Sequence, residues 1–360
     1  MSPKKIIEGV LEITAQGHGF TRKAENNFLP SSEDAFVPPA FIKKFKLREG
    51  VLLKVVLQEG NSRGRYKPVG EILSVNDLPP EKYAAVPEIK SLTSIDPFEP
   101  LKIKMDEGDV TGCVIDLFTP LAKGTRGLII SPPRAGKTTI LKHIAEAVLK
   151  NHPEVEVMIL LIDERPEEVT DFRRTVGANV YFSSSDQSVE NHLRIARLTV
   201  NMAIRKVEMG KDALVLIDSL TRMGRAFNKG SNTSGRTMSG GLDARALEIP
   251  RQFFGAARKI ENGGSLTVLA TILVETGSRM DDIIFQEFKG TGNMELVLSR
   301  ACADRRIFPA INLKESGTRK EHKILDEDLL EKSHKLRRYL VNFDEVEAMK
   351  KLLQQIDEVC

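Results

Sequence analysis

One segment of the chain, SPPRAGKTT, has the residue types and the spacing of a loop that binds phosphate. It fits the pattern GxxxxGK[ST] at Gly136, Lys137 and Thr138, with Ser131 at the place of the first glycine. A glycine allows backbone N–H groups to curl around phosphate oxygens, and the start of a following helix favours negative charge. We therefore expect Lys137 to reach the β and γ phosphates of a nucleotide and the Thr138 hydroxyl to ligate Mg²⁺.

Carboxylates stand at the ends of two aliphatic runs of strand length. The run ALVLI ends in Asp218, and MILLI is followed by Asp163 and Glu164. The carboxyl ends of parallel strands form the crevice in which open α/β sheets bind ligands. Asp218 is therefore predicted to hold the Mg²⁺ shell from a neighbouring strand, and Glu164 to polarise a water for in-line attack on the γ-phosphate.

Each of these features also has an ordinary interpretation. The loop could be a simple turn between a strand and a helix that carries a surface lysine, and Glu164 could be a solvated acid in the charged run DERPEE. The three parts occur together, however, and the loop has a strand pattern before it and a helix pattern after it. The combination favours nucleotide hydrolysis with Mg²⁺ as a cofactor.

The elements that must position these residues follow from the hydrophobic pattern. A short apolar strand precedes the loop, an amphipathic helix follows it, and three nearly continuous aliphatic runs come later, as expected of strands covered on both faces by helices. The segments are the strand 127–131, the helix 137–150 and the strands 155–162, 213–217 and 266–274. This alternation predicts an α/β fold with a mostly parallel sheet.

The first part of the chain has a different pattern. Short strands with glycines between them predict a small β-barrel, at 9–15, 19–21, 35–37, 51–57 and 69–75, with a helix-like stretch at 38–47. The prolines between Asp77 and Pro100 are typical of a linker. We therefore expect a barrel domain at 1–77, a linker at 78–100 and an α/β domain at 101–360, which carries the phosphate loop.

The composition is that of a folded chain, because 41% of its 360 residues are apolar and 29% are charged. It excludes a disordered tail or a collagen-like repeat. No apolar run approaches the roughly 18–20 residues that cross a bilayer, so we expect a cytoplasmic protein without membrane partners. The net charge of +3 lies in the first 80 residues, which weakly indicates a polyanionic partner.

Several segments give the chain a family resemblance. They are SPPRAGKTTIL, LLIDERPEEVT, LIDSLTRMGRA, GGLDARAL, PRQFFGAAR, GGSLTVLAT, FKGTGNMEL and FPAINLKESGTRKE. From Gly9 to about Glu321, in order and without large gaps, the chain resembles bacterial transcription termination factor Rho. The resemblance implies an α/β RecA-like P-loop ATPase core with a mostly parallel sheet, preceded by a small all-β OB-fold (cold-shock-like) domain.

The resemblance also implies an activity and partners. The family forms a homohexameric ring that hydrolyses ATP in response to RNA and acts as a 5′–3′ RNA/DNA helicase. It terminates transcription by binding nascent RNA and releasing it from RNA polymerase, in some cases with elongation factors. A small helical domain commonly precedes the barrel in this family. Only about eight residues precede it here, so we expect that domain to be lacking and RNA affinity to be weaker.

For the nucleotide site, the resemblance implies roles that the spacing does not reveal. Phe308 would stack on the adenine, and Arg319 would be an arginine finger offered to the γ-phosphate of the neighbouring subunit, with Arg306 beside it. By themselves, Phe308 would be taken for a core aromatic and Arg319 for a surface arginine. The implied catalytic residues are Glu164, Lys137, Asp218, Arg319 and Arg165, and the implied nucleotide-binding residues are Arg134, Ala135, Gly136, Lys137, Thr138, Thr139, Arg165, Arg306 and Phe308, with Thr138 and Asp218 for Mg²⁺.

For RNA, the resemblance implies two surfaces. The barrel would hold single-stranded, C-rich RNA by stacking bases on aromatic rings beside polar and basic residues, whereas polar loops inside the ring would grip the strand. The implied residues are Phe20, Arg22, Asp34, Phe36 and Tyr66 on the barrel and Arg236, Ser239 and Arg279 in the loops. His18 and Gly64 depart from the family pattern, which leaves base preference open. The aromatics could also simply form the barrel core.

Two other functions are compatible with parts of this pattern. A subunit of a rotary ATPase shares the core and an N-terminal barrel, but it predicts no stimulation by RNA and a requirement for membrane partners. A passive RNA-binding module, in which the nucleotide only stabilises assembly, would not need Lys137, Glu164, Asp218 and Arg319 together. The aromatic and basic residues of the barrel disfavour the rotary-ATPase subunit, and the intact catalytic set disfavours the passive module.

Overall fold

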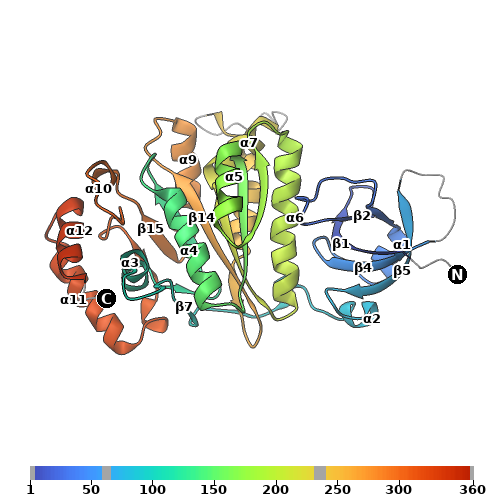
Figure 1. The fold of residues 1–360 in the computed structure, drawn as a ribbon, viewed down its shortest axis with the longest axis horizontal. Coiled ribbons are helices and arrows are strands. Elements are labelled where there is room, and N and C mark those ends of the chain that lie inside the picture. Colours follow the sequence, from blue (N-terminus) through green and yellow to red (C-terminus); the bar gives the residue numbers. More distant parts are fainter. Residues whose placement is uncertain (1–4, 59–65, 231–240, 357–360) are drawn as a thin grey trace.

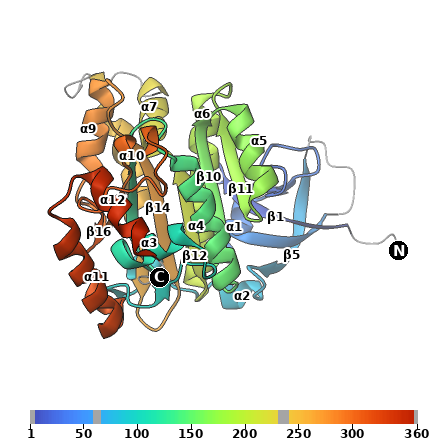
Figure 2. The same cartoon turned by 60° about the vertical axis from the view of Figure 1, so that its left-hand side comes forward.

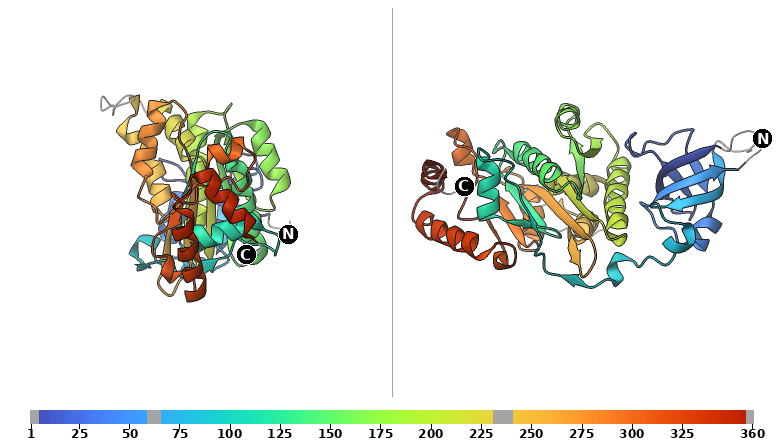
Figure 3. Two further views of the ribbon diagram at one scale, coloured as in Figure 1. Left: turned by 90° about the vertical axis from the view of Figure 1, so that its left-hand side faces the viewer. Right: turned by 60° about the horizontal axis from the view of Figure 1, so that its bottom comes forward.

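The computed structural model describes residues 5–58, 66–230 and 241–356. Figure 1 shows a small body built mainly of β-strands at one end of the molecule and a larger layered α/β body beside it. The chain runs from one body to the other along the cyan segment in the right-hand view of Figure 3. In the part of the chain that the structure describes, no helix is long and apolar enough to span a membrane.

The first body is a closed five-stranded barrel in the order β1-β2-β3-β5-β4. Its elements are β1 Ile6–Ile13, β2 Gly19–Arg22, β3 Ala35–Val37, α1 Pro39–Lys44, β4 Leu52–Leu57 and β5 Lys67–Val75. Along β5 the buried residues Val69, Ile72 and Val75 come at every third position, because the pairing with β4 shifts register twice. The predicted small β-barrel is confirmed.

The second body is built on one sheet in the order β11-β10-β12-β14-β9-β15-β16. The pairs from β11 to β15 are parallel, whereas β16 and β13 pair antiparallel. Its strands are β9 Arg126–Ser131, β10 Glu156–Glu164, β11 Asn179–Ser184, β12 Asp212–Asp218, β13 Arg258–Ile260, β14 Ser265–Leu273, β15 Met294–Val297 and β16 Gly317–Thr318, and the short β7 Pro100–Leu101 and β8 Leu121–Ala122 form a separate pair. The predicted mostly parallel sheet is confirmed.

Helices cover both faces of this sheet because its strands are apolar on both sides. On β10, Ile159 and Leu161 face one core with α3, α4 and α12, and Met158 and Leu160 face the other with α6, α7 and α8. Figure 2 shows α3, α11 and α12 lying together at one side of the sheet. The helices are α3 Val110–Phe118, α4 Lys137–Asn151, α5 Pro166–Thr175, α6 Val189–Glu208, α7 Leu220–Gly230, α8 Glu248–Gly255, α9 Arg279–Phe288, α10 Arg300–Asp304, α11 Glu327–Leu340 and α12 Glu345–Gln354.

The barrel packs directly on α6 and β11. Phe28 of the barrel stacks on Tyr181, with ring centroids 5.0 Å apart. The Asn27 side chain donates to the carbonyl of Phe182 at 2.5 Å and accepts from its N–H at 2.9 Å. These contacts attach the barrel to the strand that pairs with β10.

The proline-rich segment between the two bodies is also held in place. It contains α2 Pro80–Tyr83, a 3₁₀ turn at Ile89–Ser91 and β6 Ser94–Ile95. Tyr83 is buried in the barrel core and Ile89 in the core of the second body, and β6 pairs with β13. Prolines prevent long regular elements, but they do not prevent single apolar side chains from packing. The segment therefore connects the two bodies and also contributes single side chains to both of their cores.

Candidate active site

The phosphate loop joins β9 to α4 through a glycine in a left-handed conformation. Gly136 has φ 93°, which side chains rarely adopt, and its carbonyl accepts the first helical hydrogen bond from Ile140. The N–H groups at the start of α4 are thus available for an anion. Arg134, with φ 63°, is exposed, Ala135 is buried and Thr139 is exposed. The predicted strand, loop and helix are confirmed.

Lys137 lies between two buried carboxylates. Its Nζ is 3.3 Å from Glu164 Oε1 and also contacts Asp218 Oδ1. Glu164 is 1% exposed and Asp218 is fully buried. Glu164 Oε2 and Asp218 Oδ2 are buried with no hydrogen-bond partner among the described residues. The sequence-predicted lysine and both acids are thus brought together in one site.

The electrostatics of this site follow from burial and proximity. Burial raises the pKa of Glu164, and the neighbouring charge of Asp218 raises it further, whereas Lys137 and Arg222 oppose the shift. Burial lowers the pKa of Lys137, but the charges of Asp218 and Glu164 outweigh it and hold that pKa above its usual value. A carboxyl with a raised pKa beside a phosphate loop is suited to exchange protons near neutral pH.

Two residues of the site had no role in the sequence prediction. Arg222 on α7 places its Nε 3.0 Å from Glu164 Oε1 and donates through Nη1 to the Asp163 carbonyl at 2.7 Å. Thr271 on β14 donates to Asp218 Oδ1 at 2.8 Å. The sequence signal for Arg222 is its place four residues after Asp218 in the segment LIDSLTRMGRA.

The strand that carries Asp218 is not the immediate neighbour of the phosphate-loop strand. β14 lies between β12 and β9, so the prediction of a neighbouring strand is wrong in detail. The reason is that strand order depends on long-range pairing, which the hydrophobic runs do not encode. Thr271 occupies the intervening strand beside Asp218.

The residues present suit a divalent cation held together with phosphate oxygens. The half-buried Thr138 supplies a hydroxyl, and Asp218 supplies a buried oxygen without a partner among the described residues. No group of three or more His, Cys, Asp or Glu that could bind a metal by itself occurs in the described ranges. Mg²⁺ prefers such mixed shells of few protein oxygens, phosphates and waters.

Phe308 and Arg306 lie in the loop that follows β15 and α10. Before α10, the Leu298 N–H donates to the carbonyl of Ile130, next to the phosphate loop. The adjacent Ser299 N–H donates to the carbonyl of Ala310, at the far end of the loop. This loop therefore lies at the same edge of the sheet as the phosphate loop. Phe308 is 52% exposed, which excludes the core-aromatic interpretation, and Arg306 is exposed with φ 58°.

Arg165 and Arg319 are both exposed but lie at different edges of the sheet. Arg165 follows Glu164 and precedes α5. Arg319 follows β16, which pairs with Met294, and Met294 pairs with Gly127 at the amino end of β9. The phosphate loop follows the other end of β9, about 13 Å away at a rise of ~3.3 Å per residue. The structure therefore does not bring Arg319 to the phosphate loop of its own chain.

Aromatic rings gather on one face of the barrel. The ring centroids are 5.4 Å apart for His18 and Phe20, 5.8 Å for Phe20 and Phe36, and 4.8 Å for Phe20 and Tyr66. All four rings are half-buried, and none belongs to the buried barrel core. The aromatic platform His18, Phe20, Phe36 and Tyr66 can thus offer ring faces to nucleobases.

The polar residues of this face are less available than the sequence suggests. Arg22 lies over the ring of Phe20, 4.8 Å from its centroid, but its guanidinium is buried between Glu12 and Asp34. Arg22 therefore packs against the ring of Phe20, and Asp34 holds Arg22 in place through an ion pair. Of the loop residues, Arg279 is exposed at the start of α9. Arg236, Ser239 and Gly64 lie outside the described residues.

Comparisons with known proteins agree with this architecture. Residues 7–81 match the RNA-binding domain of Rho termination factor, and residues 112–318 match the nucleotide-binding domain of the ATP synthase alpha/beta family. The chain is 48% identical over 354 residues to transcription termination factor Rho of Aquifex aeolicus, covering 97% of this chain and 81% of that protein. It is 47% identical to that of Thermotoga maritima, covering 98% and 82%.

Solved structures share the fold at low identity. An ATPase from the type III secretion system of pathogenic bacteria has a TM-score of 0.61 at 22% identity, covering 75% of this chain and 82% of that chain. An ATP synthase subunit of Nanoarcheaum equitans has a TM-score of 0.59 at 18% identity, covering 69% and 63%. Together with the family match at residues 112–318, these shared folds confirm the predicted RecA-like P-loop ATPase fold.

Proposed function

The chain belongs to the transcription termination factor Rho family, and from this premise we propose that it is an ATP-driven RNA translocase and helicase that releases nascent transcripts from RNA polymerase. It is an ATP-hydrolysing enzyme with an RNA-binding domain. The observation that carries the proposal is Lys137 held between buried Glu164 and Asp218, in a chain that also presents an aromatic platform.

In the proposed reaction, the start of α4 and Lys137 bind the phosphates of ATP. Mg²⁺, held by Thr138 and Asp218 together with phosphate oxygens, would neutralise charge that develops on the transferred phosphoryl group. When Lys137 turns to the phosphates, Glu164 keeps the Arg222 contact. Its carboxylate can then orient and deprotonate the attacking water. Arg134 and Arg165 would contribute positive charge near the phosphates, and Phe308 an exposed ring for the adenine.

The position of Arg319 supports a ring. An arginine finger stabilises the transition state only within hydrogen-bonding distance of the γ-phosphate. Because Arg319 lies at the opposite edge of the sheet from its own phosphate loop, the finger would have to serve a neighbouring subunit. We propose the homohexamer of the family, with Arg306 near the same junction.

Two RNA contacts complete the proposal. The barrel at 1–77 would capture single-stranded, C-rich RNA on the aromatic platform, and the ATPase domain at 101–360 would pull it through the ring with Arg279, Arg236 and Ser239. The segment 78–100 would connect the two domains. Elongation factors that assist release are compatible with this arrangement.

The rotary-ATPase alternative shares only the core. The ATP synthase subunit of Nanoarcheaum equitans is 18% identical, whereas the chain is 48% identical to the Rho factor of Aquifex aeolicus and its barrel matches the Rho RNA-binding domain. The passive-module alternative is disfavoured because a binding role alone does not call for two buried carboxylates around Lys137.

Phosphate release with increasing polycytidine tests the proposal. We expect turnover to rise severalfold with the RNA, and the active species to be a hexamer by light scattering. A monomer that hydrolyses ATP equally fast without RNA would overturn both the coupling and the ring.

A further inference from the structure

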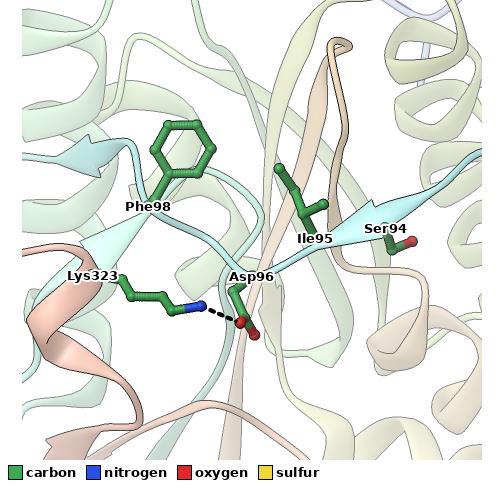
Figure 4. Close-up of a pocket in the computed structure, with 5 residues that line it drawn as sticks. All are labelled: Ser94, Ile95, Asp96, Phe98 and Lys323. Carbon is green, nitrogen blue, oxygen red and sulfur yellow. Dashed lines mark hydrogen bonds and ion pairs between the residues drawn. The ribbon is translucent and has the colours of Figure 1, made fainter.

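One acidic side chain attaches the segment between the two domains to the loop of Arg319. Asp96 follows β6, and both of its carboxylate oxygens accept from Lys320 Nζ at 2.9 Å. Asp96 Oδ2 also accepts from Lys323 Nζ at 2.7 Å. Figure 4 shows Lys323 reaching from its helical turn to Asp96, in a pocket that Ser94, Ile95 and Phe98 also line. The three contacts join residues more than 220 positions apart in the chain.

Asp96 itself has a fixed support. The strand β6 that precedes it pairs with β13, with Ile95 opposite Lys259, and β13 pairs with β14 in the main sheet. After it, β7 pairs with β8. Hydrogen bonds from Lys323 and Lys320 lower the pKa of Asp96 to about 2, so its carboxylate is charged at any working pH. The aspartate is thus a charged anchor on the ATPase sheet.

The loop of Arg319 is held on its two sides by different groups. Before the arginine, the Thr318 hydroxyl donates to the Pro120 carbonyl at 2.9 Å. At the arginine, its backbone N–H donates to the Asn293 carbonyl at 2.7 Å, while its guanidinium makes an exposed contact of 3.2 Å with the Gly290 carbonyl. After the arginine, Lys320 adopts φ 58° and contacts Asp96.

We propose that Asp96 is a positioning residue that fixes the backbone on the carboxyl side of Arg319 and so presents the guanidinium to the nucleotide of the neighbouring subunit. This inference rests on the proposed ring and arginine finger. Through Arg319, Asp96 would therefore affect hydrolysis of the triphosphate that is bound to a second copy of this chain.

The size of the effect can be estimated from geometry. Misplacing a catalytic group by about 1 Å can cost on the order of 10²-fold in rate, whereas losing a finger costs about 10³–10⁵-fold. Asp96, Lys320 and Lys323 are partly exposed, and other groups also hold the loop. We therefore expect a loss of about tenfold, well short of the loss for Arg319 itself.

The test is RNA-stimulated ATP hydrolysis by full-length Asp96→Asn rings. We expect kcat to fall about tenfold with KM for ATP unchanged, and trapping of ADP with aluminium fluoride, a transition-state mimic, to weaken. Asp96→Glu should recover most of the rate. The double variant Lys320→Met, Lys323→Met should show the same loss, and adding Asp96→Asn to it should cause no further loss.

A matched control removes an exposed carboxylate of similar kind. Glu331 contacts Lys335 at 2.8 Å on α11, so Glu331→Gln should leave kcat and trapping unchanged. The inference is overturned if Asp96→Asn rings turn over like the wild type, or if their loss appears in KM or in RNA affinity rather than in kcat. A fully active Arg319→Ala ring would instead refute the proposed finger, which separates the two failures.

Discussion

Glu12, on strand β1 of the barrel, accepts a hydrogen bond from Arg194, on helix α6 of the ATPase domain, with Oε1 and Nε 2.5 Å apart. The other oxygen of Glu12 accepts from Arg22, which lies over the ring of Phe20. One buried carboxylate therefore joins the aromatic platform of the barrel to a helix that packs on the sheet of the ATPase domain. Because the two residues are 182 positions apart, the contact exists only in the folded protein.

Replacing Glu12 tests whether this junction stabilises the protein. We expect Glu12→Gln to lower the free energy of unfolding by about 1–3 kcal/mol, since it weakens two charge-assisted hydrogen bonds in a buried setting. The control is Glu33→Gln, which removes an exposed pair with Lys23 and should leave the free energy of unfolding nearly unchanged. Urea unfolding of both variants provides the comparison, and equal losses would contradict a special role for Glu12.

The stabilising effect of Glu12 should also depend on pH. Burial raises the pKa of Glu12, but hydrogen bonds and charges from Arg194 and Arg22 outweigh it and hold that pKa below 4.5. A lowered pKa stabilises the folded state above the unfolded value, and the contribution is lost as the pH falls through the folded value. The stability difference between wild type and Glu12→Gln should be full at pH 7 and should shrink below pH 4.5. A difference that stays constant with pH would contradict this assignment.

The aromatic platform predicts where RNA binds. Phe36→Ala should weaken binding of a short cytidine oligomer by about 1–3 kcal/mol, the usual worth of one base stacked on an aromatic ring. Tyr339, an exposed ring on α11, is the control, and Tyr339→Ala should bind like the wild type. Fluorescence anisotropy at fixed salt measures both. Unchanged affinity in Phe36→Ala would place the RNA elsewhere.

The local sequence pattern was sufficient to predict the strands of the main sheet, the phosphate loop and the positions of Glu164 and Asp218. The strand runs are continuous and aliphatic, so burial on two faces could be inferred, and Gly136 and Lys137 stand between a strand and a helix as their types predict. These features depend on neighbours within a few residues. The resemblance to Rho supplied Phe308 and Arg319, whose own neighbours gave no distinguishing signal.

Long-range contacts were not accessible from the sequence. Arg222 reaches Glu164 from a helix that starts 56 positions later, Arg194 crosses from one domain to the other, and Asp96 contacts Lys320. Each of these residues would pass for a surface charge in its own segment. Their roles depend on strand order and domain docking, which are set by packing of the whole chain.

Arg319→Ala tests catalysis between subunits. We expect turnover to fall by about 10³-fold or more, because the finger stabilises charge only in the transition state, while binding of a fluorescent ATP analogue stays close to wild type. Arg338→Ala removes an exposed arginine on α11 and should leave both quantities unchanged. Turnover of Arg319→Ala at the rate of the control would show that another arginine acts.

Glu164→Gln should separate activity from stability. Loss of the general base should lower turnover by about 10²–10⁴-fold. Because burial and Asp218 raise the pKa of Glu164, the folded state binds a proton that the unfolded state releases, and its stability falls as the pH rises through the raised value. The nucleotide-free variant should therefore melt higher than the wild type at pH 8, with a smaller difference at pH 5. Glu167→Gln, an exposed acid of the same run, should change neither property.

Arg222 contacts the same oxygen of Glu164, Oε1, that Lys137 of the phosphate loop contacts, and its charge influences the protonation of this carboxyl. Its positive charge opposes the rise in the pKa of Glu164, so Arg222→Gln should raise that pKa further. Catalysis requires the deprotonated carboxylate, and the acid limb of the kcat profile should therefore move to higher pH, with most of the rate recovered in alkaline buffer. Phosphate release between pH 6 and pH 9.5 measures the shift, with Arg338→Gln as the control. A uniform loss at every pH would instead mean that Arg222 acts by holding the Asp163 carbonyl, and not by tuning Glu164.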